Sequence, residues 1–219
     1  MLRFLSIILV LVLLLSCEAE QKRNSFAEQI EQLGTDWLKL LPPSDTLRVG
    51  DIVTRLGKDM VSDAFRNFSS ENKDFSHGGI LGLDEDSNWI VYHAIGTPDN
   101  PEGILRKEKL ASFCNPIENK EMGIYRYTDT TIDIKKIIVY AELMHQKRVG
   151  FDFDFNFNTD DELYCSEFIY KAFKYANPEL DLMKIDENEG KKYLPLDRVY
   201  YNSNCILVYK TRYSRLSKK

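Results

Sequence analysis

Apolar runs of strand length recur along the chain and predict a sheet. Residues 77–83 and 89–94 are two such runs, and the polar turn at 84–88 joins them as a β-hairpin. Phe alternates with Asp or Asn over residues 151–157, which is the period of a strand. The remaining predicted strands are residues 50–53, 122–127 and 205–209.

Apolar residues at helical spacing predict four helices, at residues 25–41, 58–68, 134–144 and 165–176. Ser25 and Glu28 can form a capping box on the first helix, which we expect to pack against the domain. Gly150 fits the C-terminal cap of the third helix. Residues 96–121 are rich in Pro, Asn and charge, and they predict a loop with one short helix. Helices combined with antiparallel strands indicate an α+β fold.

The first 17 residues have the order of an export signal. Arg3 supplies a positive charge, and residues 4–15 are almost continuously apolar. This run is shorter than the roughly 20 residues that span a bilayer, and it suits a signal-peptide core. Leu14-Leu15-Ser16-Cys17 resembles a bacterial lipobox. We therefore expect Cys17 to carry a lipid that anchors the protein in the cell envelope, outside the cytoplasm. The alternative is an ordinary signal peptide with an incidental cysteine.

A length of 219 residues suits one domain with a short appendage. After the signal, we assign residues 18–45 to a polar tether and the first helix. Residues 46–212 form the predicted main domain, and residues 213–219 a basic tail. The formal net charge of −5 argues against a nucleic-acid partner, because such proteins need a basic face to neutralise phosphates.

Cys165 is the candidate nucleophile, because it lies at the predicted start of a helix. The positive end of the helix dipole favours a thiolate there and lowers the thiol pKa. The unpaired backbone N–H groups of a first helical turn can also bind an oxyanion. A buried structural cysteine is the alternative. Cys114 and Cys205 could form a disulfide in an oxidising compartment, although we expect both to be bystanders.

Two histidines can serve this thiol. His77 begins one strand of the predicted hairpin, and His93 sits in the next strand between Tyr92 and Ala94, so the two imidazoles can come close together. One would be the general base, and the other would orient it by a hydrogen bond. The alternatives are two ordinary half-buried histidines, or a zinc site that includes Cys165. We expect the third histidine, His145, to be a solvated residue near a helix end.

Six short motifs carry a resemblance to a known family. They are Gly50-Asp51-Ile52-Val53, Ser76-His77-Gly78-Gly79-Ile80, Val91-Tyr92-His93-Ala94, Phe151-Asp152-Phe153, Tyr164-Cys165-Ser166-Glu167-Phe168 and Leu194-Pro195-Leu196-Asp197. In this order they resemble the circularly permuted NlpC-type, papain-like cysteine hydrolases of the YiiX/YaeF-like group, over roughly residues 48–210. The histidine strand precedes the cysteine helix, as in the permuted group.

The resemblance implies an antiparallel sheet packed against helices, and a cysteine amidase or peptidase without a cofactor. By matching position, Cys165 is the nucleophile, His77 the base and His93 the orienting residue, where permuted members often have Glu. The implied substrate is a peptide or acyl amide, with cell-wall peptidoglycan favoured by the export signal. The alternatives are a lipid-acting acyltransferase or esterase on the same scaffold and a non-catalytic binding lipoprotein.

Overall fold

The computed structural model describes residues 34–97, 100, 102–179, 185–188 and 191–213. The chain divides into two compact units, residues 1–40 and residues 41–219. Among the described residues, no helix is both long and apolar enough to cross a membrane. Cys17 and the other residues of the predicted export signal lie outside the described part of the chain.

The described part of the first unit contains a short 3-10 helix, η1 (Asp36–Leu40). The predicted α-helix at 25–41 is therefore wrong at its end, while residues 25–33 lie outside the described residues. Gly34 explains the difference, because its backbone has a φ of 62°. That left-handed conformation interrupts an α-helix.

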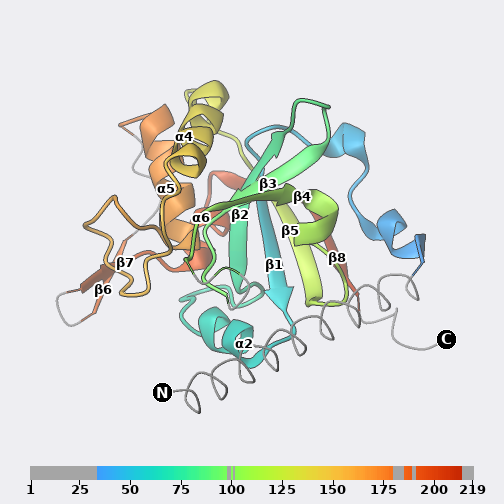
Figure 1. Cartoon of the computed structure of the whole chain (residues 1–219), viewed down its shortest axis with the longest axis horizontal. Helices are drawn as coiled ribbons and strands as arrows, with labels where there is room; N and C mark the ends of the chain where they lie inside the picture. The colour runs from blue at the N-terminus through green and yellow to red at the C-terminus, as the bar shows by residue number, and fades with distance from the viewer. Residues whose placement is uncertain (1–33, 98–99, 101, 180–184, 189–190, 214–219) are drawn as a thin grey trace, which may run out of the picture. The chain divides into compact units, whose positions relative to one another are not determined.

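A six-stranded antiparallel sheet forms the centre of the second unit, in the order β4-β3-β2-β1-β5-β8 (Figure 1). Its strands are β1 (Ile52–Gly57), β2 (His77–Leu83), β3 (Trp89–His93), β4 (Arg106–Lys109), β5 (Asn119–Tyr127) and β8 (Cys205–Arg212). The predicted hairpin is confirmed, since Ile80 of β2 pairs with Tyr92 of β3. A separate pair, β6 (Asp186–Asn188) and β7 (Lys191–Tyr193), forms a small hairpin.

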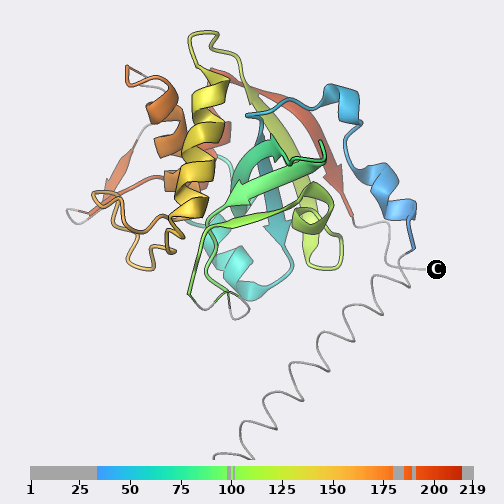
Figure 2. The same cartoon turned by 45° about the horizontal axis from the view of Figure 1, so that its top comes forward.

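Two helices, α4 (Ile134–Gln146) and α5 (Cys165–Ala176), lie side by side against the sheet (Figures 1 and 2). Ile80 of β2 and Phe168 of α5 are fully buried in the core between these layers. Each such side chain contributes about 1.5–3 kcal/mol to the free energy of unfolding. The shorter helices are η2 (Ser44–Thr46), α2 (Met60–Arg66), α3 (Leu110–Phe113) and α6 (Leu196–Tyr200). The fold is thus α+β, as predicted.

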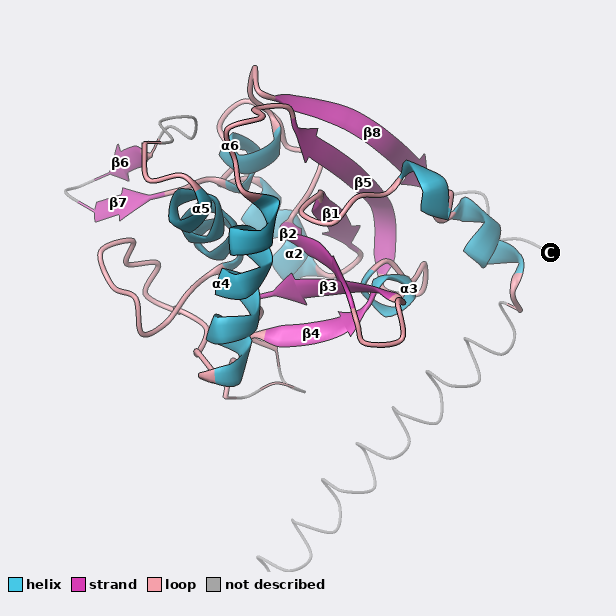
Figure 3. Ribbon diagram, turned by 90° about the horizontal axis from the view of Figure 1, so that it is seen from above, coloured by secondary structure: helices cyan, strands magenta, loops and turns pink. Residues whose placement is uncertain are grey.

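The stretch 96–121, predicted as a loop with a short helix, also contains strand β4. Its sequence, Arg-Lys-Glu-Lys, has no apolar position, so its pattern gave no strand signal. As a charged edge strand it completes the sheet and discourages pairing with another chain. β4 runs beside β3 (Figure 3), and the register of the pair sets His93 opposite Arg106 and Val91 opposite Glu108.

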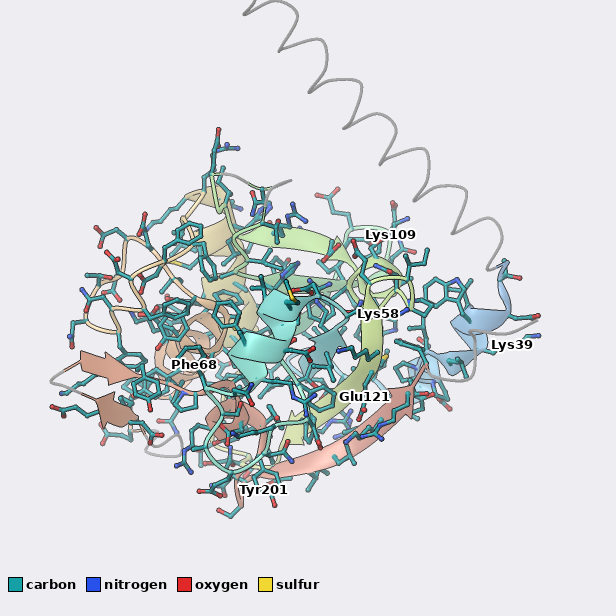
Figure 4. All side chains as sticks on the ribbon, turned by 90° about the horizontal axis from the view of Figure 1, so that it is seen from below. Lys39, Lys58, Phe68, Lys109, Glu121 and Tyr201 are labelled. Atoms are coloured by element: carbon teal, nitrogen blue, oxygen red, sulfur yellow. The ribbon has the colours of Figure 1, made fainter. Side chains whose placement is uncertain are left out.

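The predicted helix at 58–68 exists as α2, but its apolar residues do not face the core. Met60 is 87% exposed and Phe68 is 65% exposed. Figure 4 shows α2 from its outer side, with Phe68 labelled beside it. The helix is fixed instead by its N-terminal cap, where the Asp59 carboxylate accepts the backbone N–H of Ser62.

Two predictions around residue 150 are wrong. α4 ends with Lys147 as its C-cap, and the left-handed residue that follows is Arg148, with a φ of 55°, rather than Gly150. Residues 151–157 form a loop rather than a strand. The Asp152 carboxylate accepts the backbone N–H groups of Asp154 and Asn156, so a local turn replaces the strand ladder.

Candidate active site

Cys165 is the first residue of α5, as predicted from the sequence. The first turn of this helix is held by contacts to Leu194. The Leu194 backbone N–H donates to the Tyr164 hydroxyl at 2.8 Å, and the Ser166 hydroxyl donates to the Leu194 carbonyl at 2.7 Å. The Glu167 carboxylate accepts the Tyr164 backbone N–H, which closes the cap. The cysteine motif and the later Leu-Pro motif therefore form one local unit.

The thiol of Cys165 lies against the beginning of β2. Burial raises the thiol pKa above its ordinary value, and hydrogen bonds from Gly78 and Ser166 partly oppose this. The sequence-based expectation of a lowered pKa is therefore wrong for the resting site, because desolvation outweighs the helix start. Gly78 permits the close approach, since a Cβ there would lie 3.2 Å from the Ile169 side chain of α5.

His77 and His93 are in direct contact, as the predicted hairpin requires. Nε2 of His77 lies 2.9 Å from Nδ1 of His93, and both side chains are buried. The Phe113 ring packs against both imidazoles, with ring centroids 5.6 and 5.0 Å away. This hydrogen bond uses one nitrogen of His77 and leaves Nδ1 as the nitrogen that can serve the thiol.

Both imidazoles are neutral at neutral pH. Burial lowers the pKa of His77 and of His93 well below 6.5, and the positive charges of Arg55 and Arg106 lower it further. A neutral imidazole can accept a proton, so the resting site combines a protonated thiol with a neutral base. No hydrogen bond joins the Cys165 and His77 side chains among the described contacts, and such bonds tighten in many sites only when substrate binds.

The structure also contains a residue that the sequence analysis missed. The Glu108 carboxylate of β4 lies 2.8 Å from Nε2 of His93. The sequence pattern predicts a loop at β4, so it gives no reason to place Glu108 beside the histidines. The signal that could have found it is the strand register, which sets Glu108 opposite Val91, two residues before His93.

Among the described contacts, the other predicted site residues make no hydrogen bond to the histidine pair or to Cys165. Cys114, Cys165 and Cys205 are free thiols, so the possible disulfide between Cys114 and Cys205 is not formed. His145 lies in the last turn of α4, half-buried against Tyr92 rather than fully solvated.

The alternative of a zinc site does not fit the described residues. Within them, no group of three or more His, Cys, Asp or Glu side chains is placed to hold a metal ion. His77 and His93 also direct one nitrogen each at the other, at hydrogen-bond distance. A zinc ligand needs its lone pair directed at the metal.

Comparisons with known proteins identify the family of the chain. No curated protein matches it. The crystal structure of metalloprotein YiiX from Escherichia coli O157:H7 is similar in fold, with a TM-score of 0.60 at 17% identity, covering 76% of this chain and 99% of that one. The family model of the permuted papain-like amidase enzymes, YaeF/YiiX, C92 family, matches residues 46–194. The chain belongs to this family and is a papain-like cysteine hydrolase.

Proposed function

We propose that the chain is a lipid-anchored amidase that cleaves peptide or acyl amides with Cys165 as nucleophile and His77 as base. The observation that carries the proposal is the position of the thiol. It lies at the N-terminus of α5, where the Gly78 backbone, one residue after His77, acts on the thiol pKa, and His77 itself contacts His93.

The mechanism follows from the resting protonation states. Nδ1 of His77 takes the thiol proton while the sulfur forms a bond to the amide carbonyl carbon. The backbone N–H of Cys165, at the helix start, helps hold the oxyanion. The carbon–nitrogen bond then breaks, and the amine leaves with the proton from His77. Water, activated by the same imidazole, hydrolyses the thioester and restores the thiol.

The substrate class is proposed from where the enzyme would work. An export signal ending in Cys17 would hold the protein at a membrane outside the cytoplasm, where cell-wall peptides offer amide bonds. A second candidate is an acyl amide or ester. The loop that leads to Cys165 favours it, because Phe153 is 63% exposed there and Phe155 packs against Phe65 of α2. An exposed ring such as that of Phe153 can contact an acyl chain.

The test uses peptidoglycan fragments and N-acyl amino acids as parallel substrates, with products identified by mass spectrometry. The expected result is hydrolysis of one class by the wild type, and a thioester adduct on the peptide that contains Cys165. Cys205→Ala is the matched control, because Cys205 is also a free thiol but lies at the start of β8. Turnover retained by Cys165→Ala would contradict the proposal.

The anchor has its own test. In the wild type expressed in bacteria, we expect a diacylated N-terminal peptide beginning at Cys17, and protein in the membrane fraction. Cys17→Ala should lose the lipid mass and leave turnover of a soluble substrate unchanged. A wild-type protein cleaved at another residue, without lipid, would show an ordinary signal peptide instead.

A further inference from the structure

Glu108 lies behind the histidine pair on the edge strand β4. We propose that Glu108 is a positioning residue, which fixes the protons of both imidazoles so that His77 offers a lone pair at Nδ1. The inference rests on the proposed function, since it assigns a role to Glu108 through His77.

Three side chains from three neighbouring strands form a continuous line. Glu108 Oε1 lies 2.8 Å from Nε2 of His93, and Nδ1 of His93 lies 2.9 Å from Nε2 of His77. The His93 side chain is fully buried, whereas Glu108 keeps 25% of its side chain exposed. Solvent therefore has no access to His93, and the proton positions on its ring depend on these two neighbours.

The proton positions follow step by step along this line. The contact between Glu108 and Nε2 of His93 lacks the angle of a hydrogen bond. At 2.8 Å, however, an ionised carboxylate oxygen would repel a lone pair, so Nε2 of His93 carries the proton. In a neutral His93, Nδ1 then has a lone pair, and it can only accept from His77. His77 must therefore be protonated at Nε2, and its Nδ1 is left with a lone pair. One carboxylate thus selects the tautomer of both rings.

The surrounding charges give Glu108 a second effect. Arg55 of β1 lies directly opposite His77 in the sheet, and Arg106 of β4 lies opposite His93. Both arginines disfavour a positive imidazole, and both lower the pKa of the histidines. When His77 takes the thiol proton, it becomes an imidazolium. Glu108 is the carboxylate in contact with the pair, so it offsets this unfavourable charge.

Within the described residues, Cys114 and Glu118 also act electrostatically on the arginine that faces the pair. Cys114 follows α3 and is buried, which raises its thiol pKa, so it stays neutral. Glu118 attracts Arg55 electrostatically, as Glu108 does, but its carboxylate accepts a hydrogen bond from Asn115. Glu118 therefore offers a matched control: a carboxylate that acts on the same arginine but is bonded elsewhere.

The experiment measures the rate of iodoacetamide alkylation of Cys165 near neutral pH in the full-length chain, read by peptide mass spectrometry. This probe needs no knowledge of the substrate. Glu108→Gln has the same shape without the charge, and its amide can donate to His93 as well as accept. We expect it to slow alkylation roughly 10- to 100-fold, by analogy with the loss that follows when the outer partner of a metal-bound histidine is changed. Glu118→Gln should alkylate at the wild-type rate.

A double-mutant cycle with His77→Ala separates positioning from a general structural effect. If Glu108 acts through His77, then Glu108→Gln should change the rate less than about twofold in the His77→Ala background. Nitrogen NMR of ¹⁵N-histidine should show Nε2 protonation of both rings in the wild type and mixed tautomers in Glu108→Gln.

Two results would overturn the role of Glu108. One is an unchanged alkylation rate in Glu108→Gln. The other is an equal fold loss of that rate when Glu108→Gln is made in the wild type and in His77→Ala. A His77→Ala protein that alkylates as fast as the wild type would overturn it together with the proposed function. A slow His77→Ala combined with a fast Glu108→Gln would overturn the Glu108 assignment alone.

Discussion

The first turn of α5 and the edge formed by β3 and β4 hold the two parts of the candidate site by different means. The turn at Cys165 is built from consecutive residues that cap their own helix and bond to Leu194. The edge joins His93 to Glu108 only because two strands pair in one register. A contiguous motif therefore identifies the first region, whereas the second exists only after the sheet has formed.

The two regions also differ in how they hold a carboxylate. Glu167, next to Cys165 on α5, is fully buried and paired with Lys171 at 2.8 Å. Glu108 is a quarter exposed and contacts a neutral histidine. A buried carboxylate pays a desolvation cost in the folded state, while a partly exposed one remains ionised more readily. We expect Glu167 to matter most for stability and Glu108 most for reactivity.

The largest expected effect comes from removing the nucleophile or the base. Cys165→Ala and His77→Ala should each lower amide hydrolysis by a factor on the order of 10³–10⁶, because nucleophile and base act as one unit. The double variant should be no slower than the slower single variant. Single-turnover rates on the substrate found for the wild type would check this.

The control for this pair is His145→Ala, since His145 lies on α4 outside the histidine pair. It should retain wild-type turnover. If the rate of the double variant instead fell by the product of the two single-variant factors, the thiol and the imidazole would act independently.

The sequence predicted those parts of the fold that depend on local pattern. The hairpin of His77 and His93, the helix that begins at Cys165 and the α+β class followed from the spacing of apolar residues and from turn signals. The pattern could not find β4, because an edge strand of four charged residues has no apolar face. It also could not give the thiol pKa, since desolvation depends on how closely Gly78 lets α5 approach β2.

An intermediate effect concerns stability in the first region. Burial raises the pKa of Glu167 to about 7, against the opposing attraction of Lys171. An unfolded chain would ionise this carboxyl near its ordinary pKa of about 4.3. Between these two values the folded state binds more protons, so its free energy of unfolding falls as pH rises. We expect Glu167 to reduce that free energy by up to about 3 kcal/mol between pH 4 and pH 8.

Urea unfolding of the wild type and Glu167→Gln at pH 5 and pH 8 checks this dependence. The variant should lose less stability than the wild type over that interval, because an amide does not titrate. Glu142→Gln on α4 is the opposite case, since hydrogen bonding to Tyr92 lowers the pKa of the Glu142 carboxyl. Parallel pH dependence in the wild type and Glu167→Gln would contradict the assignment.

The smallest expected effect is at Phe68, for which the buried Phe168 is the contrast. Phe68 follows α2 and is 65% exposed, whereas Phe168 on α5 is fully buried beneath the cysteine turn. Replacing Phe168 with Ala should cost about 3–5 kcal/mol, because it leaves a cavity in the core. Replacing Phe68 with Ser should change the free energy of unfolding by less than about 0.5 kcal/mol, as at other surface positions. A large loss at Phe68 would mean that this side chain is covered in solution, and that the outer face of α2 belongs to the core after all.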